Sequence, residues 1–256
     1  MRYFIYLQYD GTNYHGWQTQ PDAVSVQETI EQKLSMLMRR ELFIVGAGRT
    51  DTGVHARLMV AHFDTDAEVD CQQLAFKLNN TLPPDISILR IVRVRDDAHA
   101  RFSPVARTYK YYITRRKAIF NRTFMTRVFE PLDVEMMNHA AAKLFCYRDF
   151  TSFAKLHSDT KTNICNVMEA YWQQPEPDTY VFTIKADRFL RNMVRAVVGT
   201  LVLVGRHKLT VKEFAEVIER KDRCTAGDSM AAQGLFLEDI EYPNDIFIDQ
   251  EDAFRP

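Results

Sequence analysis

The chain is organised around one stretch, Gly46-Ala47-Gly48-Arg49-Thr50-Asp51-Thr52-Gly53-Val54-His55-Ala56, which follows the apolar run Leu42-Phe43-Ile44-Val45. The apolar run predicts a buried strand. The three glycines after it predict a tight loop, because glycine lets a backbone turn sharply or approach a ligand closely. Between these glycines the loop carries the guanidinium of Arg49 and the carboxylate of Asp51. Asp51 is therefore the candidate reactive group.

Two other interpretations of this loop have to be weighed. A dinucleotide-binding fingerprint fails, because its third glycine would fall at Asp51, where an acid would repel a pyrophosphate. A structural turn, in which Asp51 caps a backbone amide and Arg49 neutralises it, also fits the local pattern. The loop by itself does not decide between that turn and a reactive site.

The composition of the chain is that of a globular protein, and its charged residues are concentrated in separate blocks along the sequence. The 256 residues are 46% hydrophobic and 26% charged, and this length allows two medium domains. The formal net charge is -1, yet residues 90–127 hold eleven Lys and Arg against Asp96 and Asp97, a local balance of +9. Residues 238–252 hold seven acids and no base. The basic block favours phosphate contacts, although basic side chains alternating outward on strands would give the same count.

The sequence predicts neither a metal site nor a membrane segment. The cysteines lie far apart, at Cys71, Cys146, Cys165 and Cys224, and the seven histidines show no ligand spacing. We therefore expect reduced thiols, no metal and no cofactor. The N-terminus lacks a signal peptide, and the strongest apolar run, residues 193–205, is interrupted by Arg195. These features predict a cytoplasmic protein.

Hydrophobic periodicity predicts the same order of elements twice, strand-helix-strand-strand-helix-strand. Helix starts are marked by Ser25, Asp70, Asp133 and the capping box at Thr210. A helix is expected from about Arg188 to Gly205. Two such units predict an α+β fold of two tandem ferredoxin-like halves. We expect residues 1–98 to form the half with the aspartate loop, and residues 99–256 the half with an extra helix and the acidic tail.

The segment Gly48–Ala56 resembles the signature of the TruA family of tRNA pseudouridine synthases. Other segments resemble those of the family in the same order along the chain, namely Tyr9–Gly11, Tyr14–Gln18, Leu82–Ile86, His99–Ser103, Ala106–Tyr111, Asp149–Phe153 and Gly234–Leu235. The likeness thus spans almost the whole chain, and nine residues around an aspartate are far more specific than a glycine pattern.

The resemblance implies a cofactor-free isomerase that converts uridine to pseudouridine at positions 38, 39 and 40 of the tRNA anticodon stem-loop. It implies a homodimer, two antiparallel sheets joined across an RNA-binding cleft, and Asp51 as the nucleophile. Arg195 is expected to pair with Asp51, because a guanidinium opposes the rise in pKa that desolvation causes. The remaining expected substrate-binding residues are Tyr109, Arg49, His55, Arg101, Arg107 and Lys110.

The residues alone leave alternatives for these roles. Arg188, Arg191 and Arg195 would share one face of a helix and could simply point to water. A tyrosine among alternating apolar residues, as at Tyr109, is more often part of a core. A non-catalytic RNA-binding protein could use the same basic and aromatic residues. Whether Asp51 attacks the base or the ribose stays open, because both require a carboxylate in nearly the same place.

Overall fold

The computed structural model describes residues 1–155 and 161–249, so Glu251 and Asp252 of the expected acidic tail lie outside the described residues. By internal contacts the chain forms two compact units, one of residues 1–105 with the segment from Leu237 onward, and one of residues 106–236. The sequence places residues 99–105 and the C-terminal segment in the second half, whereas these contacts group them with the first unit.

The first unit is a sheet with the strand order β4-β1-β3-β9, to which β2 adds beside β3. Both neighbours of β1 run antiparallel to it, and Ile5 lies opposite Ala61 on β3 and Ile91 on β4. The elements are β1 (Arg2–Tyr9), α1 (Val26–Met38), β2 (Val45–Gly46), β3 (His55–Asp64), α2 (Cys71–Thr81), β4 (Ile86–Val94) and β9 (Leu235–Glu241), whose first two residues belong to the second unit.

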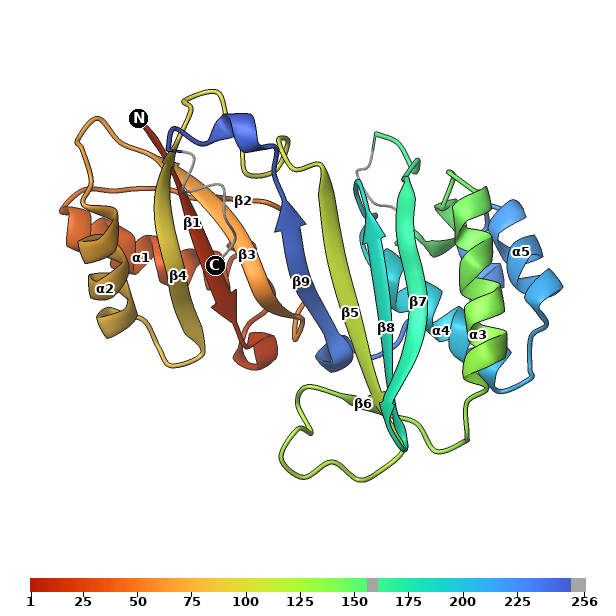
Figure 1. Cartoon of the computed structure of the whole chain (residues 1–256). Helices are drawn as coiled ribbons and strands as arrows, with labels where there is room; N and C mark the ends of the chain where they lie inside the picture. The colour runs from red at the N-terminus through yellow and green to blue at the C-terminus, as the bar shows by residue number, and fades with distance from the viewer. Residues whose placement is uncertain (156–160, 250–256) are drawn as a thin grey trace. The chain divides into compact units, whose positions relative to one another are not determined.

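The helices of the first unit begin where the sequence predicts. Ser25 accepts a hydrogen bond from the Glu28 N–H at the start of α1, and Asp70 accepts one from the Gln73 N–H at the start of α2. Each helix buries a stripe of aliphatic side chains that includes Ile30 on α1. Figure 1 shows α1 and α2 beside the strands of this unit. Strand β1 is buried from Tyr3 to Leu7 without alternation, as expected for a strand covered on both faces.

The second unit combines the sheet order β5-β8-β7 with three α-helices among its described residues. Strand β8 runs antiparallel to β5 and to β7, and the short β6 runs parallel to β5. In Figure 1 the helices gather beside β7 and β8. The elements are β5 (Ala106–Thr114), β6 (Thr126–Arg127), α3 (Val134–Ala141), β7 (Val167–Glu176), β8 (Thr179–Ala186), α4 (Met193–Gly205) and α5 (Val211–Glu219).

The expected strand at residues 42–45 is wrong, because only Val45 and Gly46 pair with β3. The backbone just before them is bonded to side chains of α1 instead. Ser35 Oγ accepts the Leu42 N–H at 2.9 Å, and Glu31 Oε1 accepts the Ile44 N–H at 2.9 Å. These bonds satisfy the donors that a strand partner would otherwise satisfy.

The expected start of the long helix near Arg188 is also wrong, since α4 begins at Met193. Asn192 has a left-handed backbone, with φ of 67°, which interrupts a helix. Arg188 and Arg191 therefore do not lie on one helical face with Arg195. Eleven of the thirteen residues of α4 are buried, as expected for a helix that is apolar on all sides.

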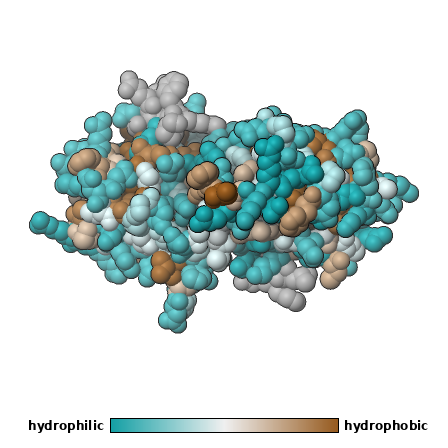
Figure 2. Space-filling model, turned by 90° about the horizontal axis from the view of Figure 1, so that it is seen from below, coloured by the Kyte–Doolittle hydropathy of each residue, from teal (hydrophilic) through white to brown (hydrophobic). Residues whose placement is uncertain are grey.

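No helix within residues 1–155 and 161–249 is long and apolar enough to cross a bilayer. In the view of Figure 2 the apolar residues form separate spots among mainly hydrophilic ones. The same described residues contain no group of three or more His, Cys, Asp or Glu side chains placed to hold a metal ion.

Candidate functional site

The aspartate loop, residues 47–54, is held by the connection between β1 and α1. The Thr50 carbonyl accepts the Trp17 N–H at 3.2 Å, and the buried Thr50 hydroxyl shares a hydrogen bond of 2.9 Å with the Tyr9 hydroxyl. Within the loop the Asp51 carbonyl accepts the Val54 N–H at 3.1 Å. The main chain on both sides of Asp51 is therefore fixed, while its side chain is partly exposed.

Two glycines allow the β1–α1 connection to lie directly against this loop. Gly16 has φ of 93°, and a Cβ there would come within 2.4 Å of the Thr50 carbonyl oxygen. A Cβ on Gly11 would come within 2.0 Å of the Val54 carbonyl oxygen. Neither position has room for another residue, so the loop conformation depends on both glycines.

His55, the first residue of β3, directly follows the loop and is only 1% exposed. Its Nδ1 atom is 3.0 Å from the Gly11 amide nitrogen and 3.0 Å from the Asp10 carboxylate. An unprotonated Nδ1 accepts the amide N–H, and a protonated one donates to the carboxylate. The structure therefore gives His55 a supporting position, and its expected contact with substrate stays a prediction.

A cavity of about 150 Å³ opens beside the aspartate loop and brings two predicted residues together, Arg49 and Arg101. A Cβ on Gly46 would lie 2.4 Å from Trp17 Nε1, so the indole packs directly on this glycine and forms one wall. None of the eight lining residues is acidic, which suits the cavity to an anionic or carbonyl group. They are Trp17, Gln18, Gln27, Val45, Gly46, Gly48, Arg49 and Arg101.

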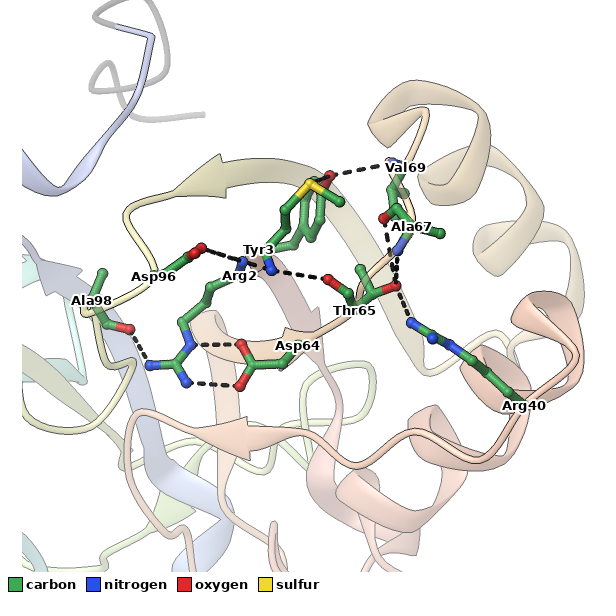
Figure 3. A network of polar contacts seen from close by, with 10 residues as sticks. Arg2, Tyr3, Arg40, Asp64, Thr65, Ala67, Val69, Asp96 and Ala98 are labelled. Atoms are coloured by element: carbon green, nitrogen blue, oxygen red, sulfur yellow. Dashed lines mark hydrogen bonds and ion pairs between the residues drawn. The ribbon is translucent and has the colours of Figure 1, made fainter.

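The segment that carries Arg101 is anchored at its start by Arg2. Arg2 donates two hydrogen bonds to Asp64, of 2.8 and 2.7 Å, and a third of 2.7 Å to the Ala98 carbonyl (Figure 3). The hydrogen bonds from Arg2 lower the pKa of the Asp64 carboxyl, which keeps this pair charged. Arg2 thus connects the start of β1 and the end of β3 to the residues just before Arg101.

A second anchor of this segment is made by His62 of β3. Its Nδ1 accepts the Ala100 N–H at 3.2 Å, and its ring lies 4.7 Å from that of His99. Burial lowers the pKa of His62 to about 4, so that the ring is neutral near pH 7 and Nδ1 remains an acceptor. The Tyr242 hydroxyl donates to the Ala100 carbonyl at 2.7 Å. Both backbone groups of Ala100 are therefore held next to Arg101.

In the second unit, β5 carries three predicted residues, Arg107, Tyr109 and Lys110. Tyr109 is partly exposed, and its ring meets that of Phe189 edge to face at 5.0 Å. Arg107 donates to the Asp187 carbonyl at 2.9 Å. Because side chains alternate along a strand, Arg107 and Tyr109 share one face of β5, and Lys110 lies on the other. The structure therefore does not place Lys110 beside Tyr109.

Arg195 occupies the first turn of α4, where its Nε donates to the Met230 carbonyl at 2.6 Å. The predicted residues thus divide between the units, with Asp51, Arg49, His55 and Arg101 in the first and Arg195, Tyr109, Arg107 and Lys110 in the second. The pairing of Asp51 with Arg195 stays a prediction.

Two cavity residues, Gln18 and Gln27, are not marked as such by the sequence. Gln27 falls inside the capping pattern of α1, which predicts only a helix start, yet its Nε2 donates to the Ile44 carbonyl at 3.1 Å. Gln18 ends a segment that resembles the family, and that resemblance was the available signal. Met230 could not be found in this way, because it acts through its backbone carbonyl.

Comparison with known proteins identifies the family of this chain. The family model for tRNA pseudouridine synthases matches residues 5–103 and 140–243. The chain is 59% identical to tRNA pseudouridine synthase A of Bacteroides thetaiotaomicron, over 97% of this chain and 93% of the relative. It is 58% identical to that of Bacteroides fragilis, over 96% of this chain and 98% of the relative. Identity to that of Shigella sonnei is 39%, over 93% and 88%. This chain therefore belongs to the tRNA pseudouridine synthase family, whose members are isomerases.

Proposed function

We propose that this protein isomerises uridine to pseudouridine at positions 38, 39 and 40 of the tRNA anticodon stem-loop, with Asp51 as the nucleophile. One observation carries the proposal: hydrogen bonds fix the main chain around the partly exposed Asp51, and the same loop lines a cavity through Gly48 and Arg49, together with Arg101. A structural turn would not need this cavity. The membership of the chain in this family supplies the reaction.

The reaction breaks the N1–C1′ bond of uridine and forms a C5–C1′ bond. The base turns between these steps, C5 loses its proton and N1 gains one, so atoms and electrons balance without a cofactor. A carboxylate suits this sequence, because it can add to the nucleotide and then leave. Attack at C6 of the base and attack at C1′ of the ribose both require the Asp51 carboxylate in nearly the same place.

Asp51 must remain ionised when RNA displaces water from it. Desolvation raises the pKa of a carboxyl group, and a neighbouring guanidinium opposes that rise. We assign this task to Arg195, whose Nε donates to the Met230 carbonyl, and we propose that the fold consists of two ferredoxin-like halves. Arg49 is close to Asp51 in sequence, but it lines the cavity, where it is better placed to contact the substrate.

The target base has to leave its stack before it can react. We propose that it stacks on Tyr109, which contributes about 1 to 3 kcal/mol and offsets part of the few kcal/mol that flipping costs. Arg101, Arg107 and Lys110 are proposed phosphate contacts. We further propose a cytoplasmic homodimer that acts on tRNA without a small-molecule cofactor.

The test is release of tritium from tRNA labelled at C5 of uridine. The wild type should release tritium, and Asp51→Asn should bind the same tRNA in a filter assay but release none. Asp22→Asn is the matched control, since Asp22 is exposed and has φ of 57°, which asparagine tolerates. Normal turnover by Asp51→Asn would refute the nucleophile. A wild type that binds tRNA without tritium release would indicate a non-catalytic RNA-binding protein.

A further inference from the structure

Arg195 and Met230 hold each other through two hydrogen bonds. Arg195 Nε donates to the Met230 carbonyl at 2.6 Å, and the Met230 N–H donates to the Arg195 carbonyl at 3.1 Å. A cation in the first turn of a helix is disfavoured by the helix dipole, so other contacts must hold it there. A bond at Nε fixes the plane of the guanidinium and hence the direction of its two terminal nitrogens.

The segment around Met230 packs against α4 without room for a side chain between them. A Cβ on Gly199 would lie 1.8 Å from the Asp228 carbonyl oxygen. Thr200, which is completely buried, joins the two elements through its hydroxyl. This hydroxyl donates to the Ala196 carbonyl at 2.8 Å and accepts the Gly227 N–H at 2.9 Å.

Further side chains hold the segment on both sides of Met230. Ser229 Oγ accepts from Asn192 Nδ2 at 2.5 Å and from Arg223 Nη2 at 3.0 Å. On the other side, the Tyr111 hydroxyl donates to the Ala231 carbonyl at 2.7 Å. The segment from Gly227 to Ala231 is therefore held on both sides of the Met230 carbonyl, which orients Arg195. We call these five residues the clamp.

We propose that the clamp orients the Arg195 guanidinium for catalysis and that Thr200 is a positioning residue of the enzyme. This proposal rests on the proposed function, in which Arg195 keeps Asp51 ionised. Thr200 acts through the Gly227 N–H, which fixes the clamp, and the clamp acts on Arg195 through Met230. If the clamp loosens, the guanidinium loses its orientation, and Asp51 ionises at a higher pH.

The test variant is Thr200→Val, which keeps the shape of the side chain but leaves the buried Gly227 N–H without its acceptor. We expect kcat for tritium release to fall about tenfold, with KM changed less than about twofold. The acid limb of the pH profile of kcat/KM should move to higher pH. Thr200→Ser should restore both values, because it keeps the hydroxyl.

The matched control is Thr183→Val, a buried threonine of β8 in the same unit whose hydroxyl has no hydrogen-bond partner among the described residues. It should leave kcat and the acid limb unchanged. Ser229→Ala loosens the clamp from a second side and should act in the same direction as Thr200→Val. It keeps the test decisive if Thr200→Val does not fold.

A readout without catalysis separates this proposal from the proposed function. Hydrogen exchange at Arg195 Nε–H, followed by NMR, should be slow in the wild type and faster in Thr200→Val and Ser229→Ala. If both exchange and the acid limb stay unchanged in both variants, the clamp proposal is wrong, even where Asp51→Asn is inactive. If the wild type releases no tritium, the proposed function fails, and unchanged exchange in the variants would overturn the clamp independently.

Discussion

Protonation of His62 should limit the stability of the protein at mildly acidic pH. The side chain is 4% exposed, lies between Phe4 and His99, and accepts the Ala100 N–H. Its burial lowers the pKa to about 4. In the unfolded chain the same imidazole is in water, with a pKa of about 6.5.

The size and sign of the effect follow from these two pKa values. The folded pKa is depressed, so the unfolded chain binds a proton in a pH range where the folded protein does not. The stability is therefore complete above about pH 6.5 and falls as the pH decreases toward 4. The full gap corresponds to about 3 kcal/mol, of which about 2 kcal/mol is lost between pH 7 and pH 5.

Urea unfolding at pH 7 and pH 5 measures this loss. The variant His62→Gln cannot take up the proton, so the difference between its two free energies of unfolding should be smaller than that of the wild type by about 2 kcal/mol. The absolute stability of the variant does not enter this comparison. His139→Gln, which replaces an exposed histidine of α3, should retain the wild-type difference. Equal pH dependence in His62→Gln and the wild type would refute the reasoning.

Two further predictions concern packing and helix capping. Gly46→Ala should lower kcat/KM and destabilise the protein by about 1 to 3 kcal/mol, because the methyl group would meet the Trp17 indole at 2.4 Å. Gly48→Ala has no atom within 4 Å of the new methyl and should be neutral in thermal unfolding; an equal loss of stability at both glycines would contradict this. Thr210→Ala removes the cap of α5 and should cost about 1 kcal/mol in urea unfolding, with unchanged turnover. Unchanged stability would show that the capping box contributes nothing.

Features that depend on neighbouring residues were predictable from the sequence. The caps at Asp70, Asp133 and Thr210 lie where the pattern places them, because a capping side chain bonds an amide three residues away. The aspartate loop was found for the same reason, since its glycines and its carboxylate are contiguous. The predicted strand at residues 42–45 failed because Ser35 and Glu31 bond its backbone, and these partners come from the preceding helix.

The supports of the site could not be predicted, because they join residues far apart in sequence. Arg2 meets Asp64 only through the register of β1 and β3, in which these two residues lie opposite each other. Arg195 donates to a backbone carbonyl, and every residue of the chain has one, so no side-chain pattern marks Met230. The resemblance to the family names reactive residues, whereas it says nothing of what holds them.

The structure also changes how the charge pattern is interpreted. Residues 90–127 have a formal charge balance of +9, which suggests one broad surface for phosphates. Asp178, from the turn between β7 and β8, binds both Arg115 and Arg116, at 2.9 and 3.1 Å. Arg95 likewise forms an ion pair with Asp245, a carboxylate outside this block, at 3.7 Å. Part of the basic block is thus already neutralised within the protein, so the positive charge offered to RNA is smaller and more localised than the count suggests.

The cavity beside the aspartate loop differs from these ion-paired arginines, because no acidic residue lines it. An anionic substrate would be drawn to that cavity for this reason, next to the loop that carries the proposed nucleophile.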